Sequence, residues 1–307
     1  MHIFLTGAAG FIGSHLAETL LKERHRITAI DNFNNFYDPK IKEKNIQNAL
    51  LSSFFSIIKG DILDQNIISN IFNDNHFDAV IHLAAYAGVR PSIENPLLYQ
   101  RVNNEGTTIL LSETAKHKIQ KFIFASSSSV YGERSGGPFC ETDNVNDPVS
   151  PYAATKKAGE LLCYTFHHLY NIDISCLRFF TVYGPRQRPE MAIHKFARQI
   201  FEKKPVTLYG DGSTSRDYTF IDDIISGVIQ SLYRAKGYHI YNLGNSHTIK
   251  LIELVNKLSQ IMKIPAHVKY FPNQAGDVPL TFADISKAKR ELDYHPHTDI
   301  DRGLDIF

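Results

Sequence analysis

A tyrosine and a lysine four residues apart form a candidate acid–base pair. Pro151 precedes Tyr152, and Lys156 follows one turn later in a segment that predicts a helix over Tyr152–Tyr170. Residues at i and i+4 share a helix face, so the ammonium group can approach the phenol. A free tyrosine has a pKa of about 10, and a cation roughly 4 Å away in a partly buried site can lower it by about 3 units. The pair therefore indicates a general base that works near neutral pH.

A run of serines precedes this pair. Ser126-Ser127-Ser128-Ser129 ends the predicted strand Phe122–Ser126. Open α/β sheets bind their ligands at the carboxyl ends of strands. A serine hydroxyl beside the tyrosine could orient or relay the proton of a substrate.

A glycine-rich loop at the start of the chain is typical of a phosphate-binding turn. Thr6-Gly7-Ala8-Ala9-Gly10-Phe11-Ile12-Gly13 follows the predicted strand Ile3–Thr6 and opens the predicted helix Phe11–Glu23. Glycine permits the tight turn, the approach of backbone to pyrophosphate and the close packing of helix on strand. The loop predicts a bound dinucleotide.

Acidic residues at the ends of the next strands favour NAD. Asp31 ends the second strand, 18 residues after Gly13. A carboxylate there binds the ribose hydroxyls of adenosine and repels a 2′-phosphate, which favours NAD over NADP. Asp61 and Ile62 follow the third strand, where they could contact the adenine, and we include Asn32 and Asn35 among the predicted cofactor contacts.

These residues require a particular set of elements to bring them together. Short, nearly continuous apolar segments alternate with helical patterns over the first 180 residues. The predicted strands are Ile3–Thr6, Ile27–Ile30, Phe54–Lys59, Ala79–Leu83, Phe122–Ser126 and Ile174–Phe180, and the further predicted helices are Asn66–Asn73 and Leu97–Lys116. This alternation predicts an α/β protein with a doubly wound parallel (Rossmann) sheet whose two faces are covered.

The pattern changes after about residue 181. We expect residues 1–180 to form an NAD-binding Rossmann domain and residues 181–307 a smaller mixed α/β substrate domain, with 218–244 returning to the main sheet. The expected elements beyond Gly184 are a strand at 206–209, helices over Ile221–Ala235 and Ile249–Lys263, and a short strand at Tyr241–Gly244.

Composition excludes several other classes of protein. The 307 residues carry 33 Lys+Arg against 32 Asp+Glu, without the basic excess of proteins that bind nucleic acid or membrane surfaces. No apolar run approaches the ~18 residues of a membrane span. The three cysteines are unpatterned and the 14 histidines form no ligand cluster, so we predict reduced thiols and no metal site. The uncharged N-terminal segment is unlike a signal peptide, and we expect a cytoplasmic protein.

Taken together, these motifs resemble the extended short-chain dehydrogenases/reductases of the NAD-dependent nucleotide-sugar epimerase/dehydratase family. The resemblance covers essentially the whole chain. Besides the motifs above, it rests on His82-Leu83-Ala84-Ala85, Leu177-Arg178-Phe179-Phe180, Arg216-Asp217-Tyr218 and Ala283-Asp284-Ile285-Ser286-Lys287-Ala288. Within the family, Ala87-Gly88-Val89-Arg90, the segment Arg178–Pro185 and Arg188-Pro189-Glu190-Met191-Ala192 look most like the UDP-glucuronate 4-epimerases.

The resemblance implies a role for each of several residues. Tyr152 would be the base, Lys156 its electrostatic partner and a ribose ligand, and Ser127 the catalytic hydroxyl, with Ser128 as the second choice. Leu83, Ala84, Ala85 and Asn103 would contact the cofactor. A UDP-sugar substrate would be bound by Arg216 at its diphosphate. Arg188 and Thr181 would hold the carboxylate of a uronate, with Arg186 or Arg90 as alternatives.

The implied activity is C4 epimerisation of UDP-glucuronate to UDP-galacturonate through a 4-keto intermediate and tightly bound NAD. UDP-glucose/UDP-galactose 4-epimerase, UDP-glucuronate decarboxylase and a non-catalytic NAD(H) sensor are alternatives. Dehydratases of the family need an Asp–Glu pair where Ser128 and Ser129 stand, which argues against dehydration.

Two helices also predict a homodimer. Apolar residues form broad faces on both, and what the sheet leaves uncovered could pair across a two-fold axis as a four-helix bundle. These residues are Leu97, Leu98, Val102, Ile109 and Leu110 on one helix, and Ala158, Leu161, Leu162, Phe166 and Leu169 on the other.

Overall fold

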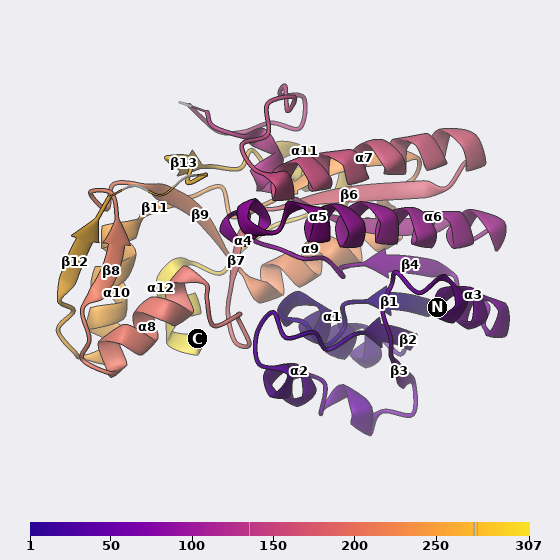
Figure 1. Ribbon diagram of the computed structural model, residues 1–307, viewed down its shortest axis with the longest axis horizontal. Helices are drawn as coiled ribbons and strands as arrows, with labels where there is room; N and C mark the ends of the chain where they lie inside the picture. Colours follow the sequence, from indigo (N-terminus) through magenta and orange to yellow (C-terminus); the bar gives the residue numbers. More distant parts are fainter. Residues whose placement is uncertain (135, 273, 275) are drawn as a thin grey trace.

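A seven-stranded sheet forms the centre of the larger part of the molecule (Figure 1). The computed structural model describes residues 1–134, 136–272, 274 and 276–307. All neighbouring strands of the sheet run parallel, in the order β10-β6-β5-β4-β1-β2-β3. The strands are β1 (His2–Thr6), β2 (Arg26–Asp31), β3 (Phe55–Lys59), β4 (Ala79–His82), β5 (Lys121–Ser127), β6 (Asp173–Phe179) and β10 (Tyr238–Leu243). The predicted doubly wound parallel sheet is therefore confirmed.

Helices cover both faces of this sheet, as its continuous apolar strands require. Alternate residues point to opposite faces: Ile3 and Leu5 of β1 join one core, and Phe4 joins the other. The first face is covered by α1 (Phe11–Lys22), α9 (Ile221–Arg234) and α11 (Ser286–Leu292). The second is covered by α3 (Gln65–Asp74), α6 (Gly106–Lys116) and α7 (Pro151–Tyr170).

A smaller mixed region adjoins the carboxyl end of the sheet (Figure 1). Its larger sheet has the strands β7 (Thr181–Tyr183), β9 (Ser215–Phe220), β11 (Thr248–Lys250) and β13 (Leu280–Thr281), and β8 (Val206–Tyr209) pairs with β12 (Val268–Phe271). Its helices are α8 (Ala192–Phe201), α10 (Leu251–Met262) and α12 (Ile300–Ile306). The chain crosses back to the main sheet for α9 and β10, whereas residues 218–220 belong to β9 of the smaller region.

The helix expected over Leu97–Lys116 is divided. It consists of α5 (Pro96–Gln100), a π-helical turn (Arg101–Glu105) and α6. Inside the turn, Asn103 bonds outside the helix through its side chain, and its carbonyl accepts the Thr107 hydroxyl at 2.5 Å. Such single π-turns are frequent at functional sites.

Several short elements carry no apolar period and were not predicted. They are α2 (Pro39–Asn45), α4 (Val89–Glu94) and the single turns Ala49–Leu51 and Ser128–Tyr131; α8 was also missed. In the residue ranges given above, no helix is long and apolar enough to cross a membrane.

Candidate active site

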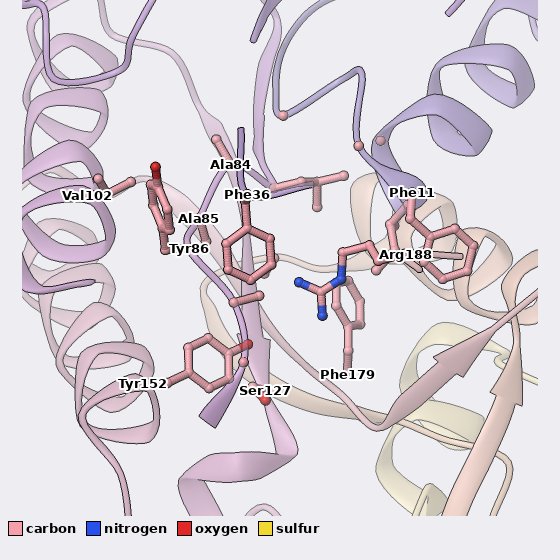
Figure 2. A pocket seen from close by; sticks show the side chains of 18 of the residues that line it. Phe11, Phe36, Ala84, Ala85, Tyr86, Val102, Ser127, Tyr152, Phe179 and Arg188 are labelled. Atoms are coloured by element: carbon pink, nitrogen blue, oxygen red, sulfur yellow. The ribbon is translucent and has the colours of Figure 1, made fainter. Parts of the chain in front are cut away.

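A cavity of about 370 Å³ opens at the carboxyl ends of the main-sheet strands (Figure 2). It runs over the point where β1 separates β4 from β2, so the strand order reverses beneath it. This switch point is where doubly wound sheets bind ligands. Residues at or just beyond the carboxyl ends of six strands line it, and among them are Gly7, Asp31, Asp61, Leu83, Ser127 and Phe180.

The glycine-rich loop forms one wall, and its geometry requires glycine. Gly7 has a φ of +73°, and a Cβ there would lie 2.7 Å from the Ala84 backbone nitrogen. A Cβ on Gly13 would overlap the Gly7 carbonyl oxygen. Gly10 caps α1, which begins at Phe11, and both line the cavity together with Ile12. The free N–H groups at the start of α1 therefore adjoin the cavity, as binding of a pyrophosphate requires.

Asp31 lies at the far end of this wall. Its carboxylate accepts the Ala9 N–H at 3.0 Å and the Phe33 N–H at 2.9 Å. Burial raises the pKa of Asp31, whereas these N–H groups and the nearby Lys42 ammonium act to lower it. Asp31 thus lines the cavity at the end of β2.

The predicted adenine contacts lie beside Asp31. Asn32 donates to Asp61 at 2.8 Å, and Ile62 is buried against Gly106. Asn35 differs from the prediction, because it is exposed and outside the cavity lining. Its neighbour Asn34 lines the cavity instead.

Lys42 is a lining residue that the sequence analysis missed. Its ammonium donates to the Asn34 carbonyl at 2.9 Å and to the Asn34 side chain at 2.8 Å. It therefore fixes the loop that follows Asp31. A lysine within the lysine-rich α2 gives no sequence signal for this contact, which only the fold creates.

Ser127, Tyr152 and Lys156 line the opposite part of the cavity, as does Ser128. The Tyr152 side chain points toward Ser127 (Figure 2). Burial raises the pKa of Tyr152, while the Ser127 hydrogen bond and the Arg188 charge lower it. Ser127 also bonds to Ser129, whose N–H it accepts at 3.2 Å.

The Lys156 ammonium lies near the Tyr152 ring and is bound by the backbone of β5. Its ammonium donates to the Ala125 carbonyl at 2.7 Å and lies 6.0 Å from the centre of the Tyr152 ring. Burial lowers the pKa of Lys156 to about 8. For Tyr152, burial outweighs the lowering influences of Ser127 and Arg188, so its pKa is raised.

The segment after β4 forms a third wall. Leu83, Ala84 and Ala85 line the cavity, as predicted from their motif. Asn103 does not. Its buried side chain accepts the Tyr86 N–H at 2.9 Å and donates to the Tyr86 carbonyl and the Thr155 hydroxyl, both at 3.0 Å. Asn103 therefore connects this wall to α7.

The predicted substrate residues separate into two groups. Arg188 and Thr181 line the cavity, with the Arg188 guanidinium directed inward (Figure 2). Arg90 and Arg216 lie outside the lining, near the smaller region. Arg90 lies over the Tyr209 ring, and both arginines are near Asp277. Arg90 pairs with Asp277 at 2.6 Å, and Arg216 donates to the Ser215 carbonyl at 2.9 Å.

A parallel sheet with a glycine turn at its switch point and an acid at the next strand end is the architecture of dinucleotide-binding proteins. The model of the NAD dependent epimerase/dehydratase family matches residues 3–244. The chain belongs to this family, which confirms the prediction of NAD as the cofactor.

Relatives within the family are similar over nearly the full length. The UDP-glucuronate 4-epimerase of Thermodesulfobacterium geofontis is 43% identical, over 99% of this chain and 94% of its own. The crystal structure of UDP-glucuronic acid 4-epimerase from Bacillus cereus, in complex with UDP-glucuronic acid and NAD, is 40% identical with a TM-score of 0.94, over 100% of this chain and 97% of its own. The UDP-glucose 4-epimerase of Thermotoga maritima with UDP-glucose is 29% identical, with a TM-score of 0.93 and the same coverage.

Proposed function

We propose that the protein interconverts UDP-glucuronate and UDP-galacturonate by inverting the configuration at C4. The observation that carries this proposal is that one cavity joins the dinucleotide loop, the pair Ser127 and Tyr152, and an inward-directed arginine, Arg188. The greater identity to UDP-glucuronate 4-epimerases than to the Thermotoga UDP-glucose 4-epimerase supports the same substrate.

In this mechanism Tyr152 removes the proton of the C4 hydroxyl while Ser127 orients that hydroxyl. NAD, when bound, would accept the C4 hydride and give it back to the opposite face of the 4-keto sugar. Lys156 would contact the nicotinamide ribose, and Tyr152 would return the proton at the end of the cycle. Asp31, Asn32, Asp61 and Ile62 would bind the adenosine half, beyond the glycine turn.

The state of the arginines supports a uronate as the substrate. A carboxylate at C6 requires a cation that is not already neutralised at short range. Arg90 and Arg186 are paired, with Asp277 at 2.6 Å and with Glu18 at 2.7 Å. Arg188 also pairs with a carboxylate, because Glu190 Oε1 lies 3.2 Å from its Nε. This contact is longer than the other two, and none of the hydrogen bonds among the described residues uses the Arg188 guanidinium. Arg188, assisted by Thr181, is therefore our choice for the carboxylate, and Arg216 for the diphosphate.

Incubation with UDP-glucuronate, followed by NMR of the sugar signals, tests this proposal directly. We expect UDP-galacturonate to form without added NAD, since no net redox change occurs. Stoichiometric consumption of NAD⁺ or NADPH would contradict the mechanism. Release of CO₂ would identify a decarboxylase, equal turnover of UDP-glucose a hexose epimerase, and the absence of any turnover an NAD(H) sensor.

We also propose that two parts of the chain bind different ligands. Residues 1–180, together with α9 and β10, would bind NAD, and the remainder of 181–307 would bind the nucleotide sugar. The cavity lining fits this division, because Thr181, Val182, Arg188 and Met191 are its contributions from beyond residue 180.

A homodimer through α5, α6 and α7 completes the proposal. Leu97, Leu161 and Leu169 are exposed by 79%, 57% and 62%, whereas Val102, Ile109 and Leu110 are buried against the sheet. An apolar set this exposed favours pairing with a second copy. Light scattering should give the mass of a dimer, and Leu161→Asp should give a monomer. A wild-type monomer at micromolar concentration would contradict the four-helix bundle.

A further inference from the structure

The Arg188 guanidinium lies against the Phe36 ring. Its central carbon is 5.6 Å from the ring centre, within the range of a cation–π contact. Figure 2 shows the two side chains side by side, with Phe36 projecting into the middle of the cavity. Only 21% of the Arg188 side chain is exposed. An aromatic ring therefore accompanies this cation, together with the Glu190 carboxylate, whose Oε1 lies 3.2 Å from Nε.

Phe36 belongs to the opposite wall and is itself fixed. It lies in the loop after Asp31, and its N–H donates to the Asn34 side chain at 3.1 Å, which Lys42 also binds. Its ring meets Tyr86 edge to face, with centres 5.8 Å apart. The ring therefore has Tyr86 on one side and Arg188 on another, so the cofactor-side loop determines where the arginine can rest.

We propose that Phe36 is a positioning residue that holds Arg188 in the orientation that receives the substrate carboxylate. Phe36 thereby sets the selectivity for a uronate over a neutral hexose. This inference rests on the proposed function, in which Arg188 binds C6. Phe36 itself needs no contact with the sugar.

Two physical effects make the contact with Phe36 useful for this purpose. A cation–π contact uses none of the guanidinium N–H groups, and Glu190 faces Nε, so the two Nη groups remain able to bind a carboxylate bidentately. An arginine already fixed in one rotamer also loses less conformational entropy when substrate binds. A neutral hexose makes no demand on this charge, so its affinity does not depend on the ring.

Binding to the NAD-loaded protein, in a Tyr152→Phe background that prevents turnover, tests the inference. Calorimetry would give the Kd of UDP-glucuronate and of UDP-glucose for each variant. Phe36→Leu removes the aromatic face and should raise the Kd of UDP-glucuronate by roughly 3- to 30-fold. The Kd of UDP-glucose should change less than about twofold. Phe36→Tyr keeps the face and should restore the wild-type ratio. Phe33→Leu is the matched control, since Phe33 lies in the same loop but faces Lys59 outside the cavity lining.

A double-mutant cycle of Phe36→Leu with Arg188→Ala distinguishes an effect of Phe36 on the position of Arg188 from an effect on the packing of the cavity wall. If Phe36 acts through Arg188, Phe36→Leu has no further effect on UDP-glucuronate binding once Arg188 is alanine. An equal loss for both nucleotides, or additive losses in the cycle, would overturn the inference while leaving the proposed function intact. A wild-type protein with no preference for UDP-glucuronate would instead contradict the proposed function, and the inference with it.

Discussion

The backbone N–H of Tyr152 donates a 3.1 Å hydrogen bond to Oγ of Ser92, 60 positions earlier in the chain. Tyr152 is in the first turn of α7, where N–H groups have no acceptor within the helix. Ser150 accepts the Ala153 N–H at 3.1 Å in the usual N-cap position, and Ser92 of α4 satisfies the second donor from outside. The Ser92 hydroxyl in turn donates to the Val89 carbonyl. The cavity wall at Val89 is therefore tied to the proposed base.

Ser92→Ala should lower kcat clearly while lowering the free energy of unfolding only modestly. Losing one cap bond costs about 1 kcal/mol of unfolding free energy, but it also frees the start of α7 from the cavity wall. A small displacement of the base lowers kcat by roughly tenfold. Ser150→Ala is the matched control, with a similar loss of stability and no broken contact to α4. Steady-state kinetics and urea unfolding give the two quantities, and equal kcat values for the two variants would contradict this role of Ser92.

Tyr152→Phe should remove the base and leave the cofactor site intact. The phenol hydroxyl is its one ionisable group, and the ring still packs edge to face against Tyr99, with centres 6.2 Å apart. We expect the epimerisation rate to fall by ~10² or more, with NAD content unchanged in the purified protein. Retention of more than a tenth of the rate would assign the proton transfer to another group.

The parts of the site that were predictable from sequence depend on local chemistry. Gly7, Gly10 and Gly13 follow from the turn that joins β1 to α1, and Asp31 from its place at a strand end. Tyr152 and Lys156 share a helix face, so their presence in one cavity also followed from spacing. The bond from the Lys156 ammonium to the Ala125 carbonyl did not, because that carbonyl belongs to β5, 31 positions earlier in the chain.

What the sequence could not supply comes from contacts between distant segments. Ser92, Phe36 and Lys42 act through partners that only the folded chain brings near. Asn103 was expected at the cofactor, but a π-turn directs its side chain to Tyr86 and Thr155 instead. Asn34, and not the predicted Asn35, lines the cavity because of the conformation of the loop. In this loop the side chains of Asn32 and Asn34 each accept the backbone N–H of the residue two positions later.

Lys156→Met should stabilise the cofactor-free protein at neutral pH. The pKa of Lys156 falls from 10.5 to about 8 on burial, which corresponds to a cost on the order of 3 kcal/mol when the lysine is charged in both states. Between about pH 8 and 10.5 the unfolded chain binds the proton that the folded protein has released, so the cost shrinks as pH rises.

The gain from Lys156→Met should therefore be about 1–3 kcal/mol at pH 7, since the bond to Ala125 is also lost. It should be smaller at pH 9.5. Urea unfolding at both values measures it, with wild type as the reference at each pH. A gain that grows with pH would show that burial does not depress this pKa.

Stability should be sensitive to the loss of one member of a buried ion pair beneath the serine run. Arg178 donates to Glu160 through Nε at 2.8 Å and Nη2 at 2.9 Å, and both side chains are 1% exposed. Glu160 also accepts the Ser126 hydroxyl at 2.7 Å. Arg178→Met leaves the buried Glu160 carboxylate with Lys157 alone, whose partly exposed ammonium is 3.5 Å away, and should cost about 3–5 kcal/mol.

Replacing both members, as in Glu160→Met with Arg178→Met, should recover much of that loss, because two apolar side chains leave no unpaired charge. Chemical denaturation of the two variants makes the comparison. A double variant no more stable than Arg178→Met would mean that packing, and not charge, explains the loss.

Arg188→Ala should lose activity selectively on the uronate. The guanidinium is directed into the cavity that Ser127 and Tyr152 also line, and burying a C6 carboxylate without it leaves an unpaired charge. We expect kcat/KM for UDP-glucuronate to fall about 30- to 1,000-fold, which corresponds to a loss of ~2–4 kcal/mol in transition-state stabilisation. Binding of UDP-glucose should change far less. Arg186→Ala is the matched control, since Arg186 pairs with Glu18 and lies outside the cavity lining.

Removing Arg188 also withdraws a charge that lowers the Tyr152 pKa, so the pH at which kcat reaches half its maximum should move upward in this variant. Equal losses on the two nucleotides would show that Arg188 serves the shared UDP portion, and the carboxylate would then have to be reassigned to Arg90 or Arg186.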